Sequence, residues 1–293
     1  MNQGFNEVKN YEEITRVDGG FSPIDTSSLI DGGHVNNLLS PIDQFIENSN
    51  KINLIVSNAS THGPISKELG NIVFLGYISA VEGYFRSLIR ALILVDERVR
   101  RNVEPRTVTY AAAIHHQREM LPEALMEGLS FASSYQVKDV LKDFIGIKGK
   151  NAFPKDVEKV LNEYKKICEL RHCCVHRFGL LGSNNAIRLG IDTHRTALEK
   201  PICFDGSSLS QTAKTIRVFV KTMNNFIFGR VLYATAINKA DDGGPLYSDN
   251  WSWNLNKDRR RFKNYYNIFA SQLDSIPSPG LKKMYNDFRD SHK

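Results

Sequence analysis

DVEKVLNEYKKICELRHCCVHRFG, residues 156–179, is the stretch of sequence that decides the fold. Its apolar residues recur at the three-and-four spacing of an amphipathic helix. They are Val157, Val160, Leu161, Tyr164, Ile167, Cys168, Cys174, Val175 and Phe178. We therefore expect one long helix, which is entered through Pro154 and stops at Gly179.

An arginine occupies the middle of this apolar stripe. With about 100° of turn per residue, Arg171 points within about 20° of Tyr164. A guanidinium group cannot lose its charge there, so it needs an anion or several hydrogen-bond acceptors. His172 and His176 lie one turn apart on the flank of the stripe. One turn of helix therefore holds a fixed cation and two groups of the kind that titrate near neutral pH.

A second long helix is expected over residues 71–100. Its stripe consists of Phe74, Ile78, Val81, Phe85, Leu88, Ile89 and Leu92. Glu82 lies beside this stripe, and two interpretations of it stay open. It pairs with Arg86 one turn on, or it helps to hold a buried cation such as Arg171.

The remaining pattern predicts shorter helices and one small hairpin. Helical spacing is expected over residues 106–129, 137–144 and 208–237. Ile187, Leu189 and Ile191 alternate with polar residues or glycine, which is typical of a half-exposed strand. Residues 201–204 are the expected partner strand. The fold class predicted from these patterns is an all-α bundle with a small β-hairpin insertion.

Composition places few limits on function. The chain has 293 residues, 41% of them hydrophobic, and a formal charge of +6, which permits a polyanionic partner without requiring one. Three of its four cysteines (Cys168, Cys173 and Cys174) crowd one helix, where neighbours do not bridge easily. We interpret Cys203 and these three as reduced thiols of a cytoplasmic protein.

No membrane segment or signal peptide is expected. The N-terminus is polar and lacks the pattern of a secretory signal. The apolar run 72–95 approaches the length of a membrane span, but it contains Glu82, Arg86 and Arg90. Charges in the middle of such a run argue against a transmembrane helix.

The two ends of the chain are expected to be extensions. Residues 1–70 are weakly patterned, residues 71–239 form the predicted helical domain, and residues 240–293 form a basic, aromatic tail. Cations beside stacking rings suit single-stranded nucleic acid. The alternative is a solvated helix whose aromatic residues dock on the body. The tail residues expected to contact RNA are Arg259, Arg260, Arg261 and Lys263.

Three interpretations of the turn around Arg171 remain open. The first is structural. The second is a metal site, since Cys168, His172 and His176 recur every four residues; three ligands would span about 12 Å, so only two plus a distant third fit one zinc ion. The third is cleavage of RNA, which needs a base, an acid and a cation for the charged phosphorane. DNA lacks the 2′-hydroxyl that this reaction uses.

The residues that favour cleavage also resemble a known family. Arg171-His172-x-x-x-His176 matches the R-polar-x(3)-H signature of HEPN domains, a subset of the Rx4–6H nuclease motif. The long helix with an internal acidic residue, the second helix before the motif, and the following Arg177-Phe178-Gly179 are similar to the same family. The resemblance covers roughly residues 71–236 and is greatest to HEPN ribonucleases of bacterial antiphage and toxin systems.

This resemblance implies a HEPN-like antiparallel helical bundle that cleaves RNA without a metal or other cofactor. It leaves 2′,3′-cyclic phosphate and 5′-hydroxyl ends. Arg171 would hold the scissile phosphate, His176 would transfer protons, His172 would orient or assist, and Glu82 would fill the acidic position of the first helix. Arg177 would contact RNA beside the motif. Some family members lack nuclease activity, so the alternative is an inactive module that binds a protein, a nucleotide or RNA.

The spacing of the motif further predicts a homodimer. Five residues turn a regular helix through about 500°, so Arg171 and His176 point about 140° apart. One straight helix cannot bring both to one phosphate. Either the helix ends early, or two chains pair their motif helices around a composite active site, as HEPN nucleases typically do. A toxin or antiphage role, with an antitoxin or defence-system partner, is expected from the resemblance alone.

Overall fold

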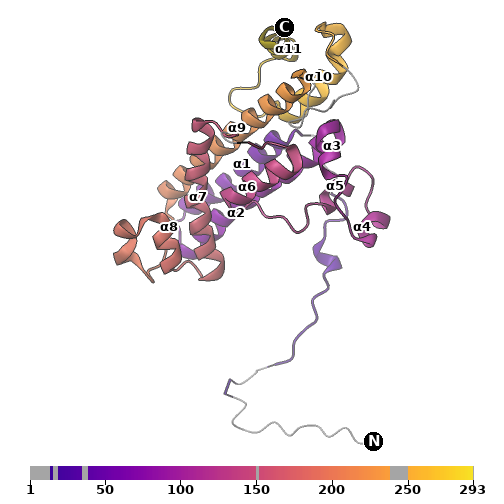
Figure 1. Cartoon of the computed structure of the whole chain (residues 1–293). Helices are drawn as coiled ribbons and strands as arrows, with labels where there is room; N and C mark the ends of the chain where they lie inside the picture. Colours follow the sequence, from indigo (N-terminus) through magenta and orange to yellow (C-terminus); the bar gives the residue numbers. More distant parts are fainter. Residues whose placement is uncertain (1–13, 16–18, 35–38, 150–151, 238–249, 293) are drawn as a thin grey trace, which may run out of the picture. The chain divides into compact units, whose positions relative to one another are not determined.

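The computed structural model describes residues 14–15, 19–34, 39–149, 152–237 and 250–292. The chain divides into two units, Met1–Leu38 and Leu39–Lys293. The described part of the first unit contains one short 3-10 turn, η2 (Ser27–Leu29). The second unit is all-α (Figure 1). Its helices are α1 (Pro41–Ser60), α2 (Lys67–Val95), α3 (Glu97–Val103), α4 (Tyr110–His115), α5 (Leu121–Ala124), α6 (Ser134–Val140), η3 (Leu141–Ile145), α7 (Lys155–His176), α8 (Ser183–His194), η4 (Arg195–Ala197), α9 (Gly206–Ile237), α10 (Leu255–Phe269) and α11 (Leu281–His292).

The boundaries of the second unit differ from those expected. It begins at Leu39, and the boundary expected after residue 70 falls inside it, in the first turn of α2. Ser40 caps α1 by accepting a hydrogen bond from the backbone N–H of Asp43, and Pro41 occupies the first turn. The boundary expected between residues 239 and 240 falls in 238–249, outside the described residues.

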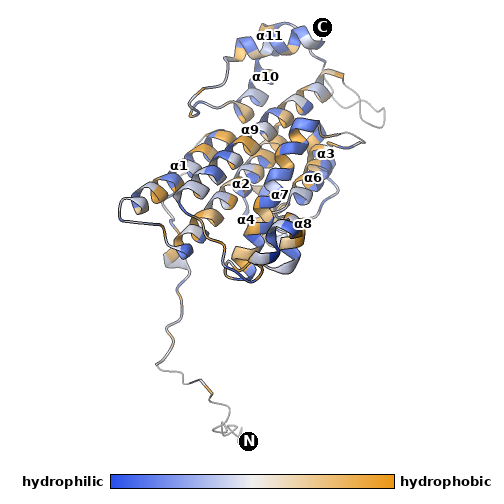
Figure 2. Cartoon of the chain, turned by 90° about the vertical axis from the view of Figure 1, so that its left-hand side faces the viewer, coloured by the Kyte–Doolittle hydropathy of each residue, from blue (hydrophilic) through white to orange (hydrophobic). Residues whose placement is uncertain are grey.

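The core of the second unit is built around α2. Phe74, Val81, Phe85 and Leu88 are fully buried, and α2 contacts α1, α7 and α9. Figure 2 shows hydrophobic residues, in orange, along these helices. By length and composition α2 is the one described helix that could cross a membrane, but most of its apolar stretch is buried inside this unit. Its hydropathy is therefore accounted for by its place in the core.

The hairpin prediction is wrong. Ile187, Leu189 and Ile191 belong to α8, which is kinked at Gly190 (φ 109°). Among the described residues the only β pairing is an isolated bridge between Leu180 and Pro201. The alternation spans five residues, too few to separate a strand from a short helix that buries Ala186 and packs Leu189 and Ile191 on a small cluster with Cys173.

The predicted helix over residues 106–129 is also interrupted. The described structure has α4 and α5 there, separated by a turn, with Pro122 in the first turn of α5. Proline lacks the backbone donor of a helix interior and fits the first turn, so it marks a helix start here. This interruption leaves Glu123 free to reach α2, where it pairs with Arg86 at 3.2 Å and Arg90 at 3.3 Å.

The C-terminal helices pack on the bundle. Trp251, Phe262 and Tyr265 are buried, and α10 contacts α1, α2 and α9. The Tyr265 hydroxyl donates to Asp96 across 2.9 Å, beside the start of α3. The rings that could have stacked on RNA bases therefore pack into the core. This is the alternative in which the aromatic residues of this segment dock on the body of the protein.

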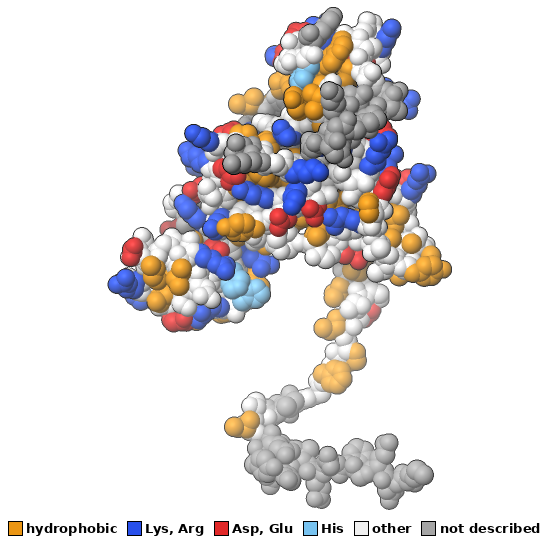
Figure 3. Space-filling model, in the orientation of Figure 1, with side chains coloured by type: hydrophobic (Ala, Val, Ile, Leu, Met, Phe, Trp, Pro, Cys, Tyr) orange, Lys and Arg blue, Asp and Glu red, His pale blue; other side chains and the backbone are white. Residues whose placement is uncertain are grey.

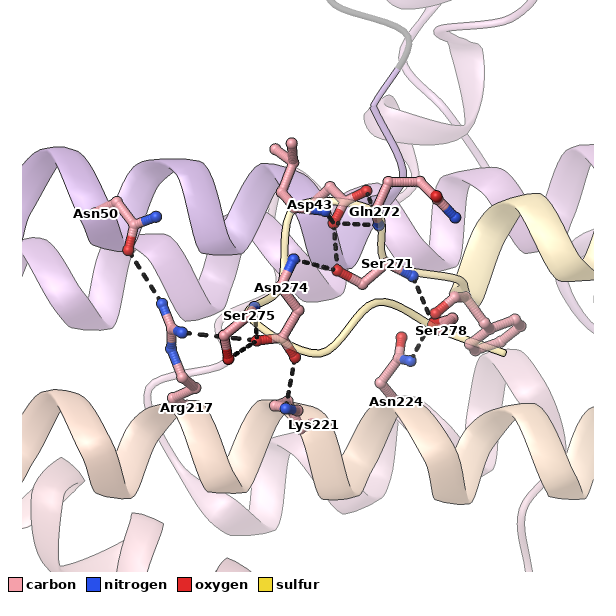
Figure 4. A network of polar contacts seen from close by, with 12 residues as sticks. Asp43, Asn50, Arg217, Lys221, Asn224, Ser271, Gln272, Asp274, Ser275 and Ser278 are labelled. Atoms are coloured by element: carbon pink, nitrogen blue, oxygen red, sulfur yellow. Dashed lines mark hydrogen bonds and ion pairs between the residues drawn. The ribbon is translucent and has the colours of Figure 1, made fainter. Parts of the chain in front are cut away.

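Two buried carboxylates hold the loop between α10 and α11 against α1 and α9 (Figure 4). Asp43 of α1 accepts hydrogen bonds from the Ser271 hydroxyl at 2.5 Å and from the backbone N–H groups of Gln272 and Leu273. Asp274 is paired with Lys221 of α9 at 2.5 Å. The Asp43 contacts join residues more than two hundred positions apart, and Lys221 and Asp274 also belong to different elements, so neither set is visible to local sequence patterns.

We expect the Asp274 anchor to weaken in acid. Burial alone would raise the pKa of Asp274, but the hydrogen bond and charge of Lys221 outweigh it and lower the pKa below 3.8. A lowered pKa contributes stability that is present above the unfolded value and lost as pH falls through the folded value. Asp274→Asn should therefore cost about 1–2 kcal/mol at pH 7, because Lys221 is partly solvated, and less below about pH 3.8.

Urea unfolding of wild type and Asp274→Asn at pH 7 and pH 3 measures this effect. Asp287→Asn is the matched control, since Asp287 forms an exposed ion pair with Lys283 on α11. An Asp274→Asn deficit that is the same at both pH values would contradict the ionic anchor.

Candidate functional site

Helix α7 is fixed in the bundle by Tyr164. The ring of Tyr164 stacks on Phe219 of α9 with centroids 4.2 Å apart, and its hydroxyl donates to the carbonyl of Phe131 at 2.7 Å. Burial raises the pKa of Tyr164 well above its ordinary value, so the hydroxyl stays a donor. The position of α7 and of the segment around Phe131 is thereby set by one side chain.

A cavity of about 640 Å³ lies between that segment, α7 and α8. Three elements line it: the loop and first turn of α6, one face of α7, and one side chain of α8. The lining residues are Ser130, Ala132, Ser133, Ser134, Tyr135, Gln136, Lys165, Cys168, Glu169, Arg171, His172 and Arg188. Lys165, Arg171 and Arg188 make three cations against one carboxylate, so the cavity suits an anion.

Arg171 is half-buried at the wall of this cavity. It makes no hydrogen bond or ion pair with any residue that the structure describes. The carboxylate of the cavity, Glu169, is committed elsewhere: it accepts from Asn185 at 2.8 Å and pairs with Arg188 at 3.4 Å. The guanidinium group of Arg171 is therefore left open to a ligand, and a charge that cannot be neutralised favours an anionic one.

The two histidines of the motif lie together on the surface. His172 and His176 are exposed, and their ring centroids are 4.6 Å apart. His172 lines the cavity, whereas His176, the last residue of α7, lies beside it. Figure 3 shows pale blue histidine side chains at the surface near α8, next to blue lysine and arginine side chains. Arg171 and His172 thus line one cavity. His176 does not line it, but its ring lies against that of His172.

Glu82 takes neither of the two expected roles. Its Oε1 atom accepts hydrogen bonds from the Ser130 hydroxyl at 3.1 Å and from the backbone N–H of Phe131 at 3.0 Å. Arg86 pairs with Glu123 instead, and no contact joins Glu82 to Arg171. Glu82 and Tyr164 therefore hold one short segment through the Ser130 hydroxyl and both backbone polar groups of Phe131, and Ser130 lines the cavity.

The chain after α7 is shaped by Gly179. It has φ 85°, and a Cβ atom at this position would lie 2.7 Å from Nδ2 of Asn71. The left-handed conformation and the close approach together require glycine. The backbone N–H of Gly179 donates to the carbonyl of Cys173, which closes the end of the helix. This turn directs the chain from His176 toward α8.

The residues expected to contact RNA are not brought together. Arg177 pairs with Glu199 at 2.5 Å on the segment after α8. Arg259, Arg260 and Lys263 are exposed on α10, and the guanidinium of Arg261 lies 4.3 Å from the ring of Trp251. Figure 1 places α10 and α8 at opposite ends of the second unit. The α10 cations therefore lie away from the cavity of Arg171.

The metal alternative gains no donor set from the described residues. No group of three or more His, Cys, Asp or Glu side chains within them converges on a point that could hold an ion. Cys168 is buried, and burial raises the pKa of its thiol to about 12, whereas thiolate is the form that binds zinc.

Three cavity residues were missed by sequence reasoning. Lys165 and Arg188 lie on separate helices, and Tyr135 belongs to the start of α6. The Lys165 ammonium lies 5.4 Å from the Tyr135 ring centroid. Their sequence signal is weak, because an exposed lysine or tyrosine on a helix is ordinary.

Comparison with protein-family models, curated proteins and solved structures finds no match to this chain.

Proposed function

We propose that the cavity of Arg171 and His172 is an RNA-cleaving site, and that the protein is a HEPN-type, metal-independent endoribonuclease. The observation that supports this most is the open guanidinium of Arg171. It lies half-buried at a cationic cavity without an ion pair from the described residues, one residue from an exposed histidine pair. A merely structural core arginine would be expected to have a partner in the protein.

The proposed reaction is an internal transfer at phosphorus. One imidazole of the pair accepts the proton of the 2′-hydroxyl as its oxygen attacks the adjacent phosphorus. The bond to the 5′-oxygen breaks, and the other imidazole donates a proton to that leaving oxygen. Arg171 stabilises the added charge on the phosphorane. His176 has the main proton-transfer role, His172 orients or assists, and the products are a 2′,3′-cyclic phosphate and a 5′-hydroxyl.

The other cavity residues suit a nucleic-acid strand. Lys165 and Arg188 offer positive charge to phosphates beside the scissile one. The Tyr135 ring is mostly exposed at the cavity wall, so a base can stack on it. Glu82 serves this site indirectly, by holding the Ser130–Phe131 segment in place.

A homodimer with a composite site remains part of the proposal. Four apolar side chains next to the motif face solvent, and Phe178 is 85% exposed with φ 51°. They are Val175, Phe178, Leu180 and Ile187. A left-handed phenylalanine costs about 1–2 kcal/mol, and within one chain its ring gains little packing in return. A second copy of the chain would cover this apolar patch and set two motif helices face to face.

We expect light scattering to give twice the chain mass of 33.2 kDa. Phe178→Asn should shift the protein to monomer, because asparagine tolerates φ > 0 but removes the apolar ring. Leu54→Asn is the matched control, since Leu54 is an exposed apolar residue of α1. A wild-type monomer, or a dimer that Phe178→Asn leaves intact, would contradict this patch as the dimer interface.

Cleavage and melting temperature are expected to be unchanged by EDTA. The proposed acid–base reaction uses only side chains of the chain, whereas a zinc-dependent site would lose activity or stability on chelation. The assay compares activity before EDTA, with EDTA, and after zinc is restored. Zinc-restored activity would favour the metal alternative.

The second candidate is an inactive HEPN-type module that binds a protein, a nucleotide or RNA. The exposed apolar patch favours this candidate as well, since the patch could bind an antitoxin or defence-system partner instead of a second copy of the chain. A role in growth arrest or phage defence inside the cytoplasm belongs to either candidate. Toxicity on expression that disappears in His176→Ala would favour the nuclease; partner binding without RNA cleavage would favour the module.

A further inference from the structure

A groove of about 510 Å³ lies between α1, α2 and α9, formed by a set of residues different from that of the Arg171 cavity. Most of its lining residues carry a polar or charged side chain. The lining residues are Ser49, Asn50, Asn53, Val56, Ser57, Tyr77, Ser210, Ala213, Lys214 and Arg217. None of its described lining residues is an aspartate or glutamate, and its volume falls within the range of small-molecule sites.

The side-chain carbonyl oxygens of both asparagines in the groove already accept hydrogen bonds. Oδ1 of Asn50 accepts from the guanidinium of Arg217 at 3.1 Å, and Figure 4 shows these two side chains pointing toward one another. Oδ1 of Asn53 accepts from the Tyr77 hydroxyl at 2.7 Å. The NH₂ group of each asparagine has no hydrogen-bond partner among the described residues, and an NH₂ group can only donate.

Further donors have no partner among the described residues. They are the Lys214 ammonium and the hydroxyls of Ser57 and Ser210. Arg217 adds a second cation. Its guanidinium group lies 3.8 Å from the Asp274 carboxylate, which is paired more closely with Lys221 at 2.5 Å. The groove therefore presents two cations, two amide NH₂ groups and hydroxyls that can donate, with no carboxylate among its described lining residues, which is the chemistry that binds phosphate oxygens.

Ser49 is a second, independent observation that points to a ligand in this groove. Its side chain is 5% exposed, and its Oγ is the one buried side-chain polar atom of the described residues without a hydrogen-bond partner. An unsatisfied buried hydroxyl is unfavourable, and in native proteins such a group is commonly satisfied by a bound molecule or water.

From this surplus of donors we infer that the groove binds a small phosphorylated molecule of about nucleotide size. Lys214 and Arg217 supply the charge for the phosphate, and Asn50, Asn53 and the serine hydroxyls donate to phosphate or sugar oxygens. Because Arg217 also contacts Asn50 and Asp274, a bound phosphate would lie next to the anchor of the α10–α11 loop. The groove is independent of the proposed RNA cleavage.

Calorimetric titration of the full chain tests this inference with inorganic phosphate, pyrophosphate, ribose 5-phosphate and adenosine monophosphate. We expect saturable binding of at least one phosphorylated sugar or nucleotide, one per chain. Lys214→Gln should weaken it about tenfold or more, since a charge-assisted contact is lost. Lys214 is exposed and has no partner in the part of the chain that the structure describes, so its replacement should leave the melting temperature unchanged.

Two variants serve as controls. Lys282→Gln removes the same charge from an exposed position on α11 and should bind like wild type. Arg171→Ala opens the RNA cavity and should also leave this binding unchanged. An oligodeoxynucleotide, which cannot be cleaved through a 2′-hydroxyl, separates free phosphate compounds from a nucleic-acid backbone.

Three results would overturn the inference. The first is that none of the four small probes binds. The second is that binding is lost in Arg171→Ala but kept in Lys214→Gln, which would place the binding site in the Arg171 cavity. The third is that only the oligodeoxynucleotide binds. In the last case Lys214 contacts a nucleic-acid backbone and the groove is not a small-molecule site.

Discussion

His176→Ala is expected to lower the rate of RNA cleavage about 10²–10⁴-fold, which is the usual contribution of one proton-transfer group. The His176 imidazole lies beside that of His172 at the end of α7, next to the cavity that Arg171 lines. Single-turnover cleavage of a defined RNA by purified protein measures the effect directly, because binding and product release are then separated from chemistry.

Matched variants make this result specific. His176 is exposed and makes no hydrogen bond with a described residue, so the melting temperature of His176→Ala should match wild type. His115→Ala replaces an exposed histidine of α4 and should cleave normally. Arg171→Ala should lose about 10²–10³-fold through the phosphorane charge. Wild-type cleavage by His176→Ala would remove the catalytic assignment.

Truncation after Ala240 is expected to prevent folding of the second unit. Among the described residues it removes six buried aromatic side chains: Trp251, Phe262, Tyr265, Phe269, Tyr285 and Phe288. Each buried side chain of this size contributes about 1.5–3 kcal/mol, and a domain has only about 5–15 kcal/mol of net stability. It also removes Ser271, which donates to Asp43, and Asp274, the ion-pair partner of Lys221. Circular dichroism during heating should show no cooperative transition at the wild-type midpoint.

The same observation changes how a role of α10 in RNA binding must be tested. Arg259, Arg260 and Lys263 are exposed, so their joint replacement by glutamine should leave the fold intact. Weaker, less salt-dependent RNA binding by this variant would support phosphate contacts by α10. A cooperative melt of the truncated chain near the wild-type temperature would contradict the packing of α10 and α11.

The helix at the centre of the candidate site was predictable from sequence. The stripe from Val157 to Cys174 spans many turns, and α7 begins where Pro154 indicated. The end of the stripe was not predictable, because Val175 and Phe178 fit the helical period yet face solvent. Periodicity gives the direction of a side chain and does not say whether another element covers it.

Contacts between distant segments explain the other differences. Glu82 holds residues forty-eight and forty-nine positions away, and Asp43 holds the loop at Ser271. A basic, aromatic segment such as α10 has the same composition whether its rings stack on bases or pack on a core. Only the path of the chain decides between them, and here Asp96 and the neighbouring helices receive the rings.

The chemistry of the RNA ends tests the central proposal most directly. A defined RNA is incubated with wild type or His176→Ala in the presence of EDTA, and the new ends are sequenced after ligation methods selective for each end type. The proposed attack by the 2′-hydroxyl predicts 2′,3′-cyclic phosphate and 5′-hydroxyl ends from wild type, and none above background from His176→Ala. Ends with 3′-hydroxyl and 5′-phosphate, or the absence of cleavage by wild-type dimer, would contradict it.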